Sequence, residues 1–248
     1  MTVAVIQFPG SNCEKEALDA LDCNGVSATL VDWNTTESLD SYNGFVLPGG
    51  FSYQDRIRAG IIAAKLPIIQ SLINQSTLYK KPILGICNGA QILVESGLLD
   101  GNQSLSTIID MNYVNQQSTN FVCDWAFLTP YNKSESMFLT DFPDNAILPI
   151  QVCHGEGRFI FNSPPNSGLQ YCKMNGDIST SFPDTPNGST QGIAAIGNTA
   201  GNVLAIMPHP ERSLNQKRYP KSIQLIAEKN GYELINWDPL FRVFKEVS

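Results

Sequence analysis

The first third of the chain alternates short apolar runs with segments that favour helix. Apolar runs rich in Val, Ile and Leu occupy residues 3–8, 28–31, 44–47 and 82–86. Near-continuous runs of this length are typical of strands that are covered on both faces. Strands that alternate with helices at this spacing predict a parallel, doubly wound α/β sheet with helices on both of its faces.

Three helices are expected, two between these strands and one after the last of them. The first begins after a cap at Ser11 or Asn12 and extends through Leu21. The second covers residues 58–73, where Pro67 kinks or splits it, and the third covers residues 88–96.

The pattern changes after Gly101. Residues 108–114 and 121–128 predict antiparallel strands, and residues 162–192, rich in Asn, Ser, Pro and Gly, predict long surface loops. Residues 222–247 predict a closing helix that is interrupted at Gly231 and Pro239. No break in composition marks a boundary, so one domain over residues 1–248 is expected.

The composition narrows the class of protein. With 16 basic and 23 acidic residues the formal net charge is −7, and such a surface repels phosphate backbones, so no nucleic-acid partner is expected. The first apolar run ends at Pro9 without a basic leader, which predicts a cytoplasmic protein with neither signal peptide nor membrane span. Six cysteines without a Cys-x-x-Cys pair, and only two histidines, favour reduced thiols and no metal site.

Cys87 is the candidate nucleophile. It stands in the pattern Gly-x-Cys-x-Gly at 85–89, between a predicted strand and a predicted helix. A sharp strand-to-helix turn projects such a residue above the sheet edge, and the helix N-terminus favours the thiolate. A buried thiol in a tight turn is the plainer interpretation, but the two glycines in this context favour the nucleophile.

His209 is the candidate general base, because a thiol nucleophile needs one and the chain has two histidines. It lies in Pro-His-Pro-Glu at 208–211, directly after the apolar strand at 203–207. Each proline keeps the preceding residue extended, so His209 and Glu211 should point to the same side, and Glu211 can orient the imidazole. His154 cannot pair with its neighbour Cys153, because adjacent strand residues face opposite sides.

Backbone N–H groups complete the candidate site. Gly49 and Gly50 end the strand at 44–47, where a turn can direct N–H groups at a developing oxyanion. Together with the N–H of Asn88, they predict a two-donor oxyanion hole. An ordinary tight turn is the alternative interpretation of the two glycines taken alone.

The three segments together resemble the signatures of the class I (triad) glutamine amidotransferases. These signatures are Leu-Pro-Gly-Gly at 47–50, Gly-Ile-Cys-Asn-Gly-Ala-Gln at 85–91 and Pro-His-Pro-Glu at 208–211. The chain is more narrowly similar to the glutaminase subunits of phosphoribosylformylglycinamidine synthases in purine biosynthesis. The motifs that carry this narrower resemblance lie at 7–13, 49–53, 58–60, 87–89, 121–123, 154–158, 186–189, 201–204 and 207–212.

The resemblance implies a flavodoxin-like fold and a role for each matched residue. Cys87, His209 and Glu211 would form the catalytic triad, which hydrolyses glutamine to glutamate and ammonia. Gly50 and Asn88 would form the oxyanion hole. Residues near the bound glutamine would include Gly49 and Gln91.

The resemblance also implies partners. Ammonia would pass to a large synthetase subunit that uses ATP and magnesium, with a small third subunit bridging the two in some organisms. No cofactor or metal is expected in this chain itself. Gln54 stands where the family often has Gly before Asp55, and the loops between 102 and 190 look longer than in compact members, so the partner-facing surface is expected to differ.

Residues 154–158 read His-Gly-Glu-Gly-Arg, which we interpret as close to the site or to an interface, against the plainer interpretation of a turn with a surface salt bridge. The alternatives for the whole chain are a glutaminase that serves another synthetase, another cysteine hydrolase of the same fold, and a catalytically silent scaffold subunit.

Overall fold

The computed structural model describes residues 2–99, 107–118 and 121–246. Its helices are α1 (Glu14–Cys23), α2 (Pro67–Tyr79), α3 (Asn88–Glu95), α4 (Lys221–Asn230) and α5 (Asp238–Glu246). Its strands are β1 (Val3–Gln7), β2 (Ala28–Asp32), β3 (Gly44–Leu47), β4 (Ile83–Ile86), β5 (Thr107–Met111), β6 (Tyr113–Val114), β7 (Gln117–Ser118), β8 (Val122–Tyr131), β9 (Leu148–His154), β10 (Glu156–Phe161), β11 (Gly168–Cys172), β12 (Ile193–Gly197) and β13 (Val203–Ile206).

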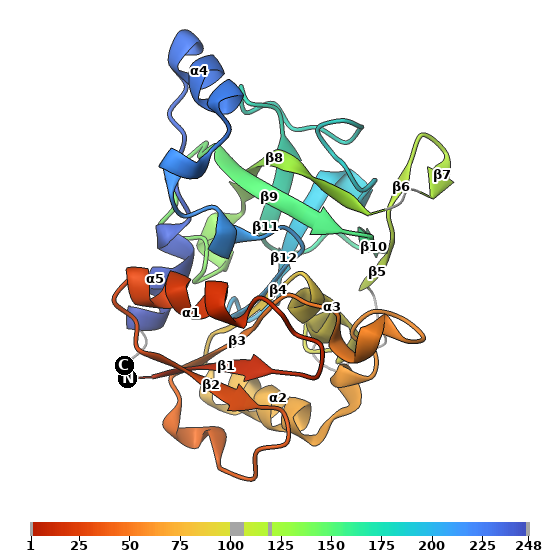
Figure 1. Cartoon of the computed structure of the whole chain (residues 1–248), viewed down its shortest axis with the longest axis vertical. Helices are drawn as coiled ribbons and strands as arrows, with labels where there is room; N and C mark the ends of the chain where they lie inside the picture. Colours follow the sequence, from red (N-terminus) through yellow and green to blue (C-terminus); the bar gives the residue numbers. More distant parts are fainter. Residues whose placement is uncertain (1, 100–106, 119–120, 247–248) are drawn as a thin grey trace.

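Nine of these strands form one mixed sheet in the order β2-β1-β3-β4-β13-β12-β11-β8-β9 (Figure 1). The neighbours from β2 to β13 are parallel, and the neighbours from β13 to β9 are antiparallel. Strands β3, β4 and β13 are buried along their whole length, as their continuous apolar sequences require. The predicted α/β class is therefore confirmed.

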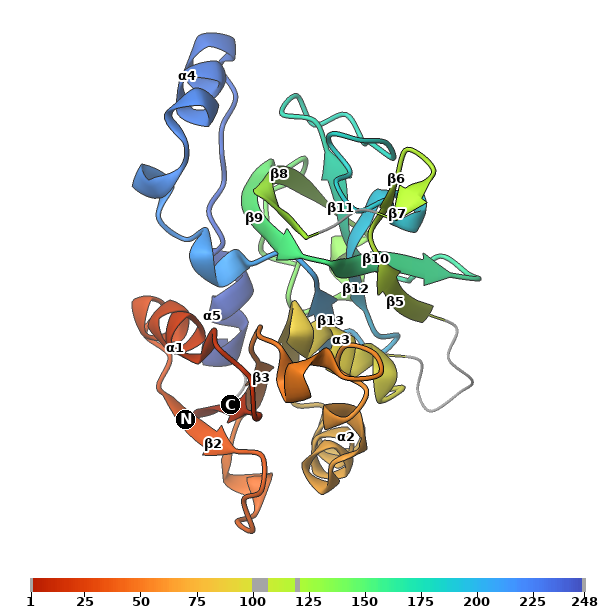
Figure 2. The ribbon, with the colours of Figure 1, turned by 45° about the vertical axis from the view of Figure 1, so that its right-hand side comes forward.

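Helices cover both faces of the parallel strands. Figure 2 shows α1 and α5 on one side of these strands and α2 and α3 on the other. Helices on both faces are what right-handed crossovers between parallel strands produce. Among the described residues, no helix is both long enough and apolar enough to cross a bilayer.

Two predictions about the first helices were wrong in detail. Cys13, not Ser11 or Asn12, precedes α1, and its side chain makes no capping hydrogen bond; the Ser11 hydroxyl instead accepts a hydrogen bond from the N–H of Phe8. The second helix begins at Pro67 and is preceded by a 3-10 turn at Ala63–Lys65, so the predicted start at residue 58 was wrong and the predicted break at Pro67 is present. Proline lacks an N–H, and the first helical position needs none, so Pro67 starts the helix.

The second half differs more from the prediction. Residues 108–114 and 121–128 do form antiparallel strands, but β5 pairs with β10 and β8 pairs with β9 and β11. The predicted loop at 162–192 contains β11, an inner strand of the main sheet, whose five residues are obscured in the sequence by flanking Asn, Ser and Pro. The described part of 102–190 thus contains strands β5 to β11, and the predicted loops are present at 162–167 and 173–189, while residues 102–106 and 119–120 lie outside the described residues.

The C-terminal prediction was partly correct. Gly231 ends α4 in the left-handed conformation, as expected of a glycine after a helix. Pro239 lies in the first turn of α5 and does not interrupt it. Val247, the predicted last residue of this helix, is outside the described residues.

Candidate active site

Three neighbouring parallel strands supply the predicted site residues. Strands β3, β4 and β13 are adjacent, and Gly49, Cys87 and His209 follow their carboxyl ends. Ligands of open α/β sheets bind at this edge. Cys87 and His209, which were each predicted to follow a strand, therefore lie at the same edge of the sheet.

Cys87 occupies a strained strand-to-helix turn. Its backbone angles are φ 52° and ψ −107°, and its N–H donates to Ile206 O of β13 at 2.8 Å. A non-glycine residue with such angles costs about 1–3 kcal/mol, which the surrounding packing must offset. Cβ atoms at the flanking glycines would collide with backbone: at Gly85 with Gly89 O (2.7 Å), and at Gly89 with Leu47 O (2.0 Å). The two glycines therefore allow α3 to pack directly against β3 and β4.

Glu211 contacts His209 through a turn, not through an extended chain. The side chains meet with Oε1 of Glu211 2.6 Å from Nδ1 of His209. Residues Pro210–Arg212 form a 3-10 turn, so the predicted extended alternation was wrong, although the predicted pairing is present. Strand β9 holds the segment in place, because His209 N donates to Gln151 O at 2.8 Å.

The electrostatics of His209 favour its protonated form. Its side chain is buried, which by itself lowers the pKa. The Glu211 carboxylate, and after it the thiols of Cys87 and Cys13, outweigh this and raise the pKa of His209 well above its ordinary value of 6.5. An imidazolium beside a cysteine is the partner that stabilises a thiolate.

Gly49 lies where the three side chains meet. A Cβ atom at this position would be 2.9 Å from His209 Cε1, 3.1 Å from Cys13 Sγ and 3.4 Å from Cys87 Cβ. Only a residue without a side chain leaves these groups room to approach one another. The chain at Gly49 therefore forms the floor beneath the candidate nucleophile and its base.

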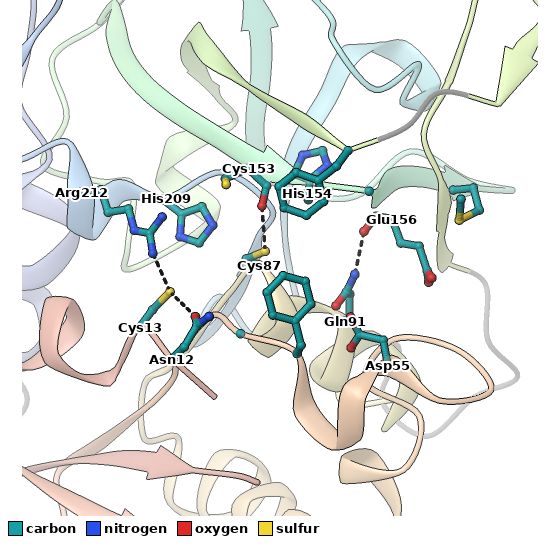
Figure 3. Close-up of a pocket in the computed structure, with 15 residues that line it drawn as sticks. Asn12, Cys13, Asp55, Cys87, Gln91, Cys153, His154, Glu156, His209 and Arg212 are labelled. Carbon is teal, nitrogen blue, oxygen red and sulfur yellow. Dashed lines mark hydrogen bonds between the residues drawn. The ribbon is translucent and has the colours of Figure 1, made fainter. Parts of the chain in front are cut away.

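A cavity of about 240 Å³ opens above Cys87 (Figure 3). Cys13, His209 and Arg212 lie on one side of Cys87, and Gln91, Asp55 and Glu156 lie on the other. The full set of lining residues also includes Asn12, Gly50, Phe51, Met111, Phe121, Cys153, His154 and Gly155.

The two predicted backbone donors lie at or next to this cavity, because Gly50 lines it and Asn88 directly follows the lining residue Cys87. Asn88 is the first residue of α3, where the N–H has no partner within the helix. Gly50 also lines the cavity, and within the described part of the chain its N–H donates to no backbone carbonyl. Its φ of 151° and the contact of a Cβ with Ser11 Cα at 2.6 Å admit glycine alone.

Asn88 and Gln91 organise the far side of the cavity. The Asn88 side chain accepts from Ser52 N at 3.0 Å and donates to Asp55 Oδ1 at 3.1 Å. It also donates to Gln91 Oε1 at 2.8 Å, and Gln91 in turn donates to Glu156 O at 2.6 Å. These bonds connect α3 to the loop after β3 and to β10.

Asp55 was not predicted as a site residue. Burial, and then the nearby Glu156 carboxylate, raise its pKa from 3.8 to about 6, against the hydrogen bond from Asn88. Its only sequence signal is its place after the motif at 49–53, where the loop departs from the pattern of the family.

Cys13 and Arg212 also belong to the site but were not assigned to it. Arg212 Nη2 donates to Cys13 Sγ at 3.1 Å, and Cys13 donates to Asn12 Oδ1 at 3.1 Å. Cys13 and Arg212 are the last residues of the motifs at 7–13 and 207–212, and their place in these motifs is the sequence signal that could have assigned them to the site. Ligand-type atoms of Cys13, His209 and Glu211 lie within 4.8 Å of one another. His209 and Glu211 pair with each other, Cys13 contacts Arg212 and Asn12, and we assign no metal.

Both interpretations of the motif at 154–158 hold in part, because some of its residues line the cavity and another forms a salt bridge. His154 and Glu156 line the cavity, whereas Arg158 forms an ion pair with Asp110 at 2.9 Å. Burial, and then the charge of His209, lower the pKa of His154 to about 3. A neutral, buried His154, with Nδ1 3.2 Å from Asn112 Oδ1, is not a competing base.

Comparisons with known proteins show the family of this chain. A family model described as a CobB/CobQ-like glutamine amidotransferase domain matches residues 1–246. The chain belongs to this glutamine amidotransferase family. The resemblance to class I glutamine amidotransferases is thereby confirmed.

Relatives of this amidotransferase support the narrower resemblance. It is 38% identical over 237 residues to the phosphoribosylformylglycinamidine synthase subunit PurQ of Methanothrix thermoacetophila, covering 89% of this chain and 90% of the relative. The PurQ subunit of Methanopyrus kandleri is 35% identical over 218 residues, covering 86% and 90%.

Solved structures agree with the sequence relatives. The amidotransferase superposes on a chain of the PurLQS structure from Thermotoga maritima with a TM-score of 0.74 and 31% identity, covering 99% and 96% of the two chains. Another glutamine amidotransferase from Thermotoga maritima shares the fold with a TM-score of 0.50 and 18% identity, covering 99% and 90%.

Proposed function

We propose that this chain is the glutaminase subunit of a phosphoribosylformylglycinamidine synthase and works in the cytoplasm. The observation that carries the proposal is the convergence of Cys87 and the His209–Glu211 pair on Gly49, in a chain related over most of its length to PurQ subunits. A chain with a complete triad-type site has the groups that glutamine hydrolysis needs.

The first half-reaction begins at Cys87. Its thiolate attacks the side-chain amide carbon of glutamine, and the oxyanion that forms accepts hydrogen bonds from the N–H groups of Gly50 and Asn88. His209 gives its proton to the amide nitrogen, the C–N bond breaks, and ammonia leaves a glutamyl thioester on Cys87. Glu211 keeps the imidazole in position and stabilises its charge.

The second half-reaction releases glutamate. His209, now neutral, takes a proton from water, which attacks the thioester carbon through the same oxyanion geometry. The C–S bond breaks, and Cys87 is restored as the thiolate beside the imidazolium. Gln91, which lines the cavity, and Gly49, which lies next to Cys87 and His209, position the glutamine.

The proposed partners follow from the relatives. A large synthetase subunit, using ATP and magnesium, would take up the ammonia and convert formylglycinamide ribonucleotide, and a small third subunit would bridge the two chains. The PurLQS structure, which contains a chain similar to this one, supports such an assembly. This chain itself is proposed to carry no cofactor.

The test measures ammonia release from glutamine by the chain mixed with the synthetase subunit, ATP and formylglycinamide ribonucleotide. Cys87→Ala should abolish glutamine-dependent synthesis and leave ammonia-dependent synthesis intact. Cys23→Ala, which removes an exposed thiol outside the cavity, is the matched control. Equal loss of both activities in Cys87→Ala would favour a scaffold subunit, and glutamine hydrolysis only with another synthetase would favour a different pathway.

A further inference from the structure

Two cysteines face each other across strands β8 and β9, and one of them, Cys153, lines the cavity. Cys123 of β8 is directly opposite Cys153 of β9 in their antiparallel pairing. Residues opposite one another in such a pair have Cα atoms about 4.5 or 5.5 Å apart, and both values lie inside the range of roughly 4.4–6.8 Å that disulfides require. The sulfurs are already 3.7 Å apart. The pairing of the strands therefore permits a disulfide after a small adjustment at the two cysteines.

The two thiols differ in environment. Cys123 is exposed, whereas Cys153 is partly buried and lines the cavity. Burial, and then the hydrogen bond to Cys123, raise the pKa of Cys153. Cys153 therefore keeps its proton and donates it toward the Cys123 sulfur. The exposed Cys123 sulfur is the one that meets a dissolved oxidant first.

The remaining thiols have other partners or lie elsewhere. Cys87 donates to the backbone O of Cys153 at 3.7 Å, and Cys13 is held between Arg212 and Asn12. All six cysteines are within the described residues, and among them Cys123 and Cys153 are the pair whose sulfurs are in contact. An oxidised Cys123 can therefore form a disulfide with Cys153 rather than with the candidate nucleophile Cys87.

We propose that Cys123 and Cys153 are a reversible redox pair, whose disulfide forms in the wall of the active-site cavity and lowers glutamine turnover. The oxidant is a peroxide. The Cys123 sulfur attacks one oxygen, the O–O bond breaks, and a sulfenic acid and water form. The Cys153 sulfur then attacks the Cys123 sulfur; the S–S bond forms, the S–O bond breaks, and hydroxide leaves as water with the Cys153 proton.

The effect on turnover rests on the proposed function. Forming the bond draws the sulfurs from 3.7 Å to about 2.05 Å, which pulls the Cys153 side chain toward β8. The carbonyl of Cys153 accepts the hydrogen bond of Cys87, so a shift at Cys153 changes the position of the nucleophile. A dithiol reductant reverses the change, because an exposed cross-strand disulfide is readily reduced.

The first test maps the disulfide in the folded chain. The protein is treated with limiting hydrogen peroxide, remaining thiols are alkylated, and peptides are analysed by mass. The expected product is a Cys123–Cys153 cross-linked peptide that disappears after dithiothreitol. Cys123→Ser should abolish it and Cys23→Ser, which removes another exposed thiol, should not. A disulfide that includes Cys87, or oxidation that leaves Cys123 and Cys153 reduced, would overturn the proposal.

The second test measures glutamine hydrolysis by the same samples in the assembled complex. Turnover of the parent chain should fall several-fold on oxidation and recover with dithiothreitol, and Cys123→Ser should show no such recoverable fall. Unchanged turnover in a fully cross-linked sample would refute the regulatory effect. The mass measurement does not depend on catalysis. The cross-link can therefore be shown or refuted even if the proposed glutaminase function is wrong.

Discussion

Glu211 Oε1 lies 2.6 Å from His209 Nδ1 because the chain turns at Pro210. Both side chains are buried, so their interaction is screened little by solvent. The bond fixes Nδ1 as the protonated nitrogen and leaves Nε2 to act on the thiol and the leaving group. The pair therefore governs both the proposed proton transfers and part of the pH dependence of the fold.

Glu211→Gln should lower glutamine turnover by roughly 10²–10⁴-fold, because the amide does not stabilise the imidazolium. Glu16→Gln is the control, since Glu16 contacts Arg212 at 3.5 Å and not the imidazole. Steady-state kinetics of the assembled complex decide the matter, and equal effects of the two substitutions would contradict the role of Glu211.

The same substitution should change stability in a pH-dependent way. Although burial lowers it, the pKa of His209 lies above 6.5 in the folded chain, because the Glu211 carboxylate and the Cys87 and Cys13 sulfurs together raise it by more. The stability that this pair contributes is fully present below pH 6.5 and is lost as the pH rises through the folded pKa. Urea unfolding should therefore show the largest loss in Glu211→Gln below that pH, and a constant difference across pH would argue against the coupling.

Gly49→Ala should remove activity while leaving most of the stability. The added methyl would lie 2.9 Å from His209 Cε1 and 3.1 Å from Cys13 Sγ, so the base must move away from Cys87. Turnover and thermal unfolding are measured on the same preparation. Full turnover in a folded Gly49→Ala protein would show that the observed geometry is not the reactive one.

Asp55→Asn should stabilise the chain at neutral pH. Burial and Glu156 raise the pKa of Asp55 from 3.8 to about 6. The folded state therefore favours the protonated carboxyl, and that stability is present below pH 3.8 and is lost as the pH rises through about 6. Asparagine is a neutral substitute that still accepts from Asn88. We expect a modest rise in Tm at pH 7, since Asp55 is partly exposed, and no rise near pH 4. A lower Tm of Asp55→Asn at pH 7 would refute this prediction.

Gly157→Ala should destabilise the fold by about 1–3 kcal/mol through overpacking. The added methyl would lie 2.1 Å from Cε1 of the buried His154 ring. Gly155→Ala is the matched control, because among the described residues its methyl meets Phe121 Cδ2 alone, at an ordinary 3.6 Å. Equilibrium unfolding of the two variants gives the comparison, and equal stabilities would show that the His154 ring adjusts freely.

The parallel half of the sheet was predictable because each strand carries its own signal. The runs at 44–47 and 82–86 became β3 and β4 almost to the residue, since a strand buried on both faces is continuously apolar. Strand β11 escaped prediction because its five residues sit among loop-forming residues, and its burial comes from neighbours distant in the sequence.

The candidate triad could also be predicted, because Cys87, His209 and Glu211 lie in short motifs whose glycines and prolines restrict the local backbone. The sequence by itself determined these residue types and the strand ends that carry them. Only the tertiary structure decided that Glu211 reaches His209 through a turn, that Arg212 contacts Cys13, and that Cys153 faces Cys123. These contacts join segments up to 199 residues apart, and their geometry depends on sheet order and strand register, which local propensity does not encode.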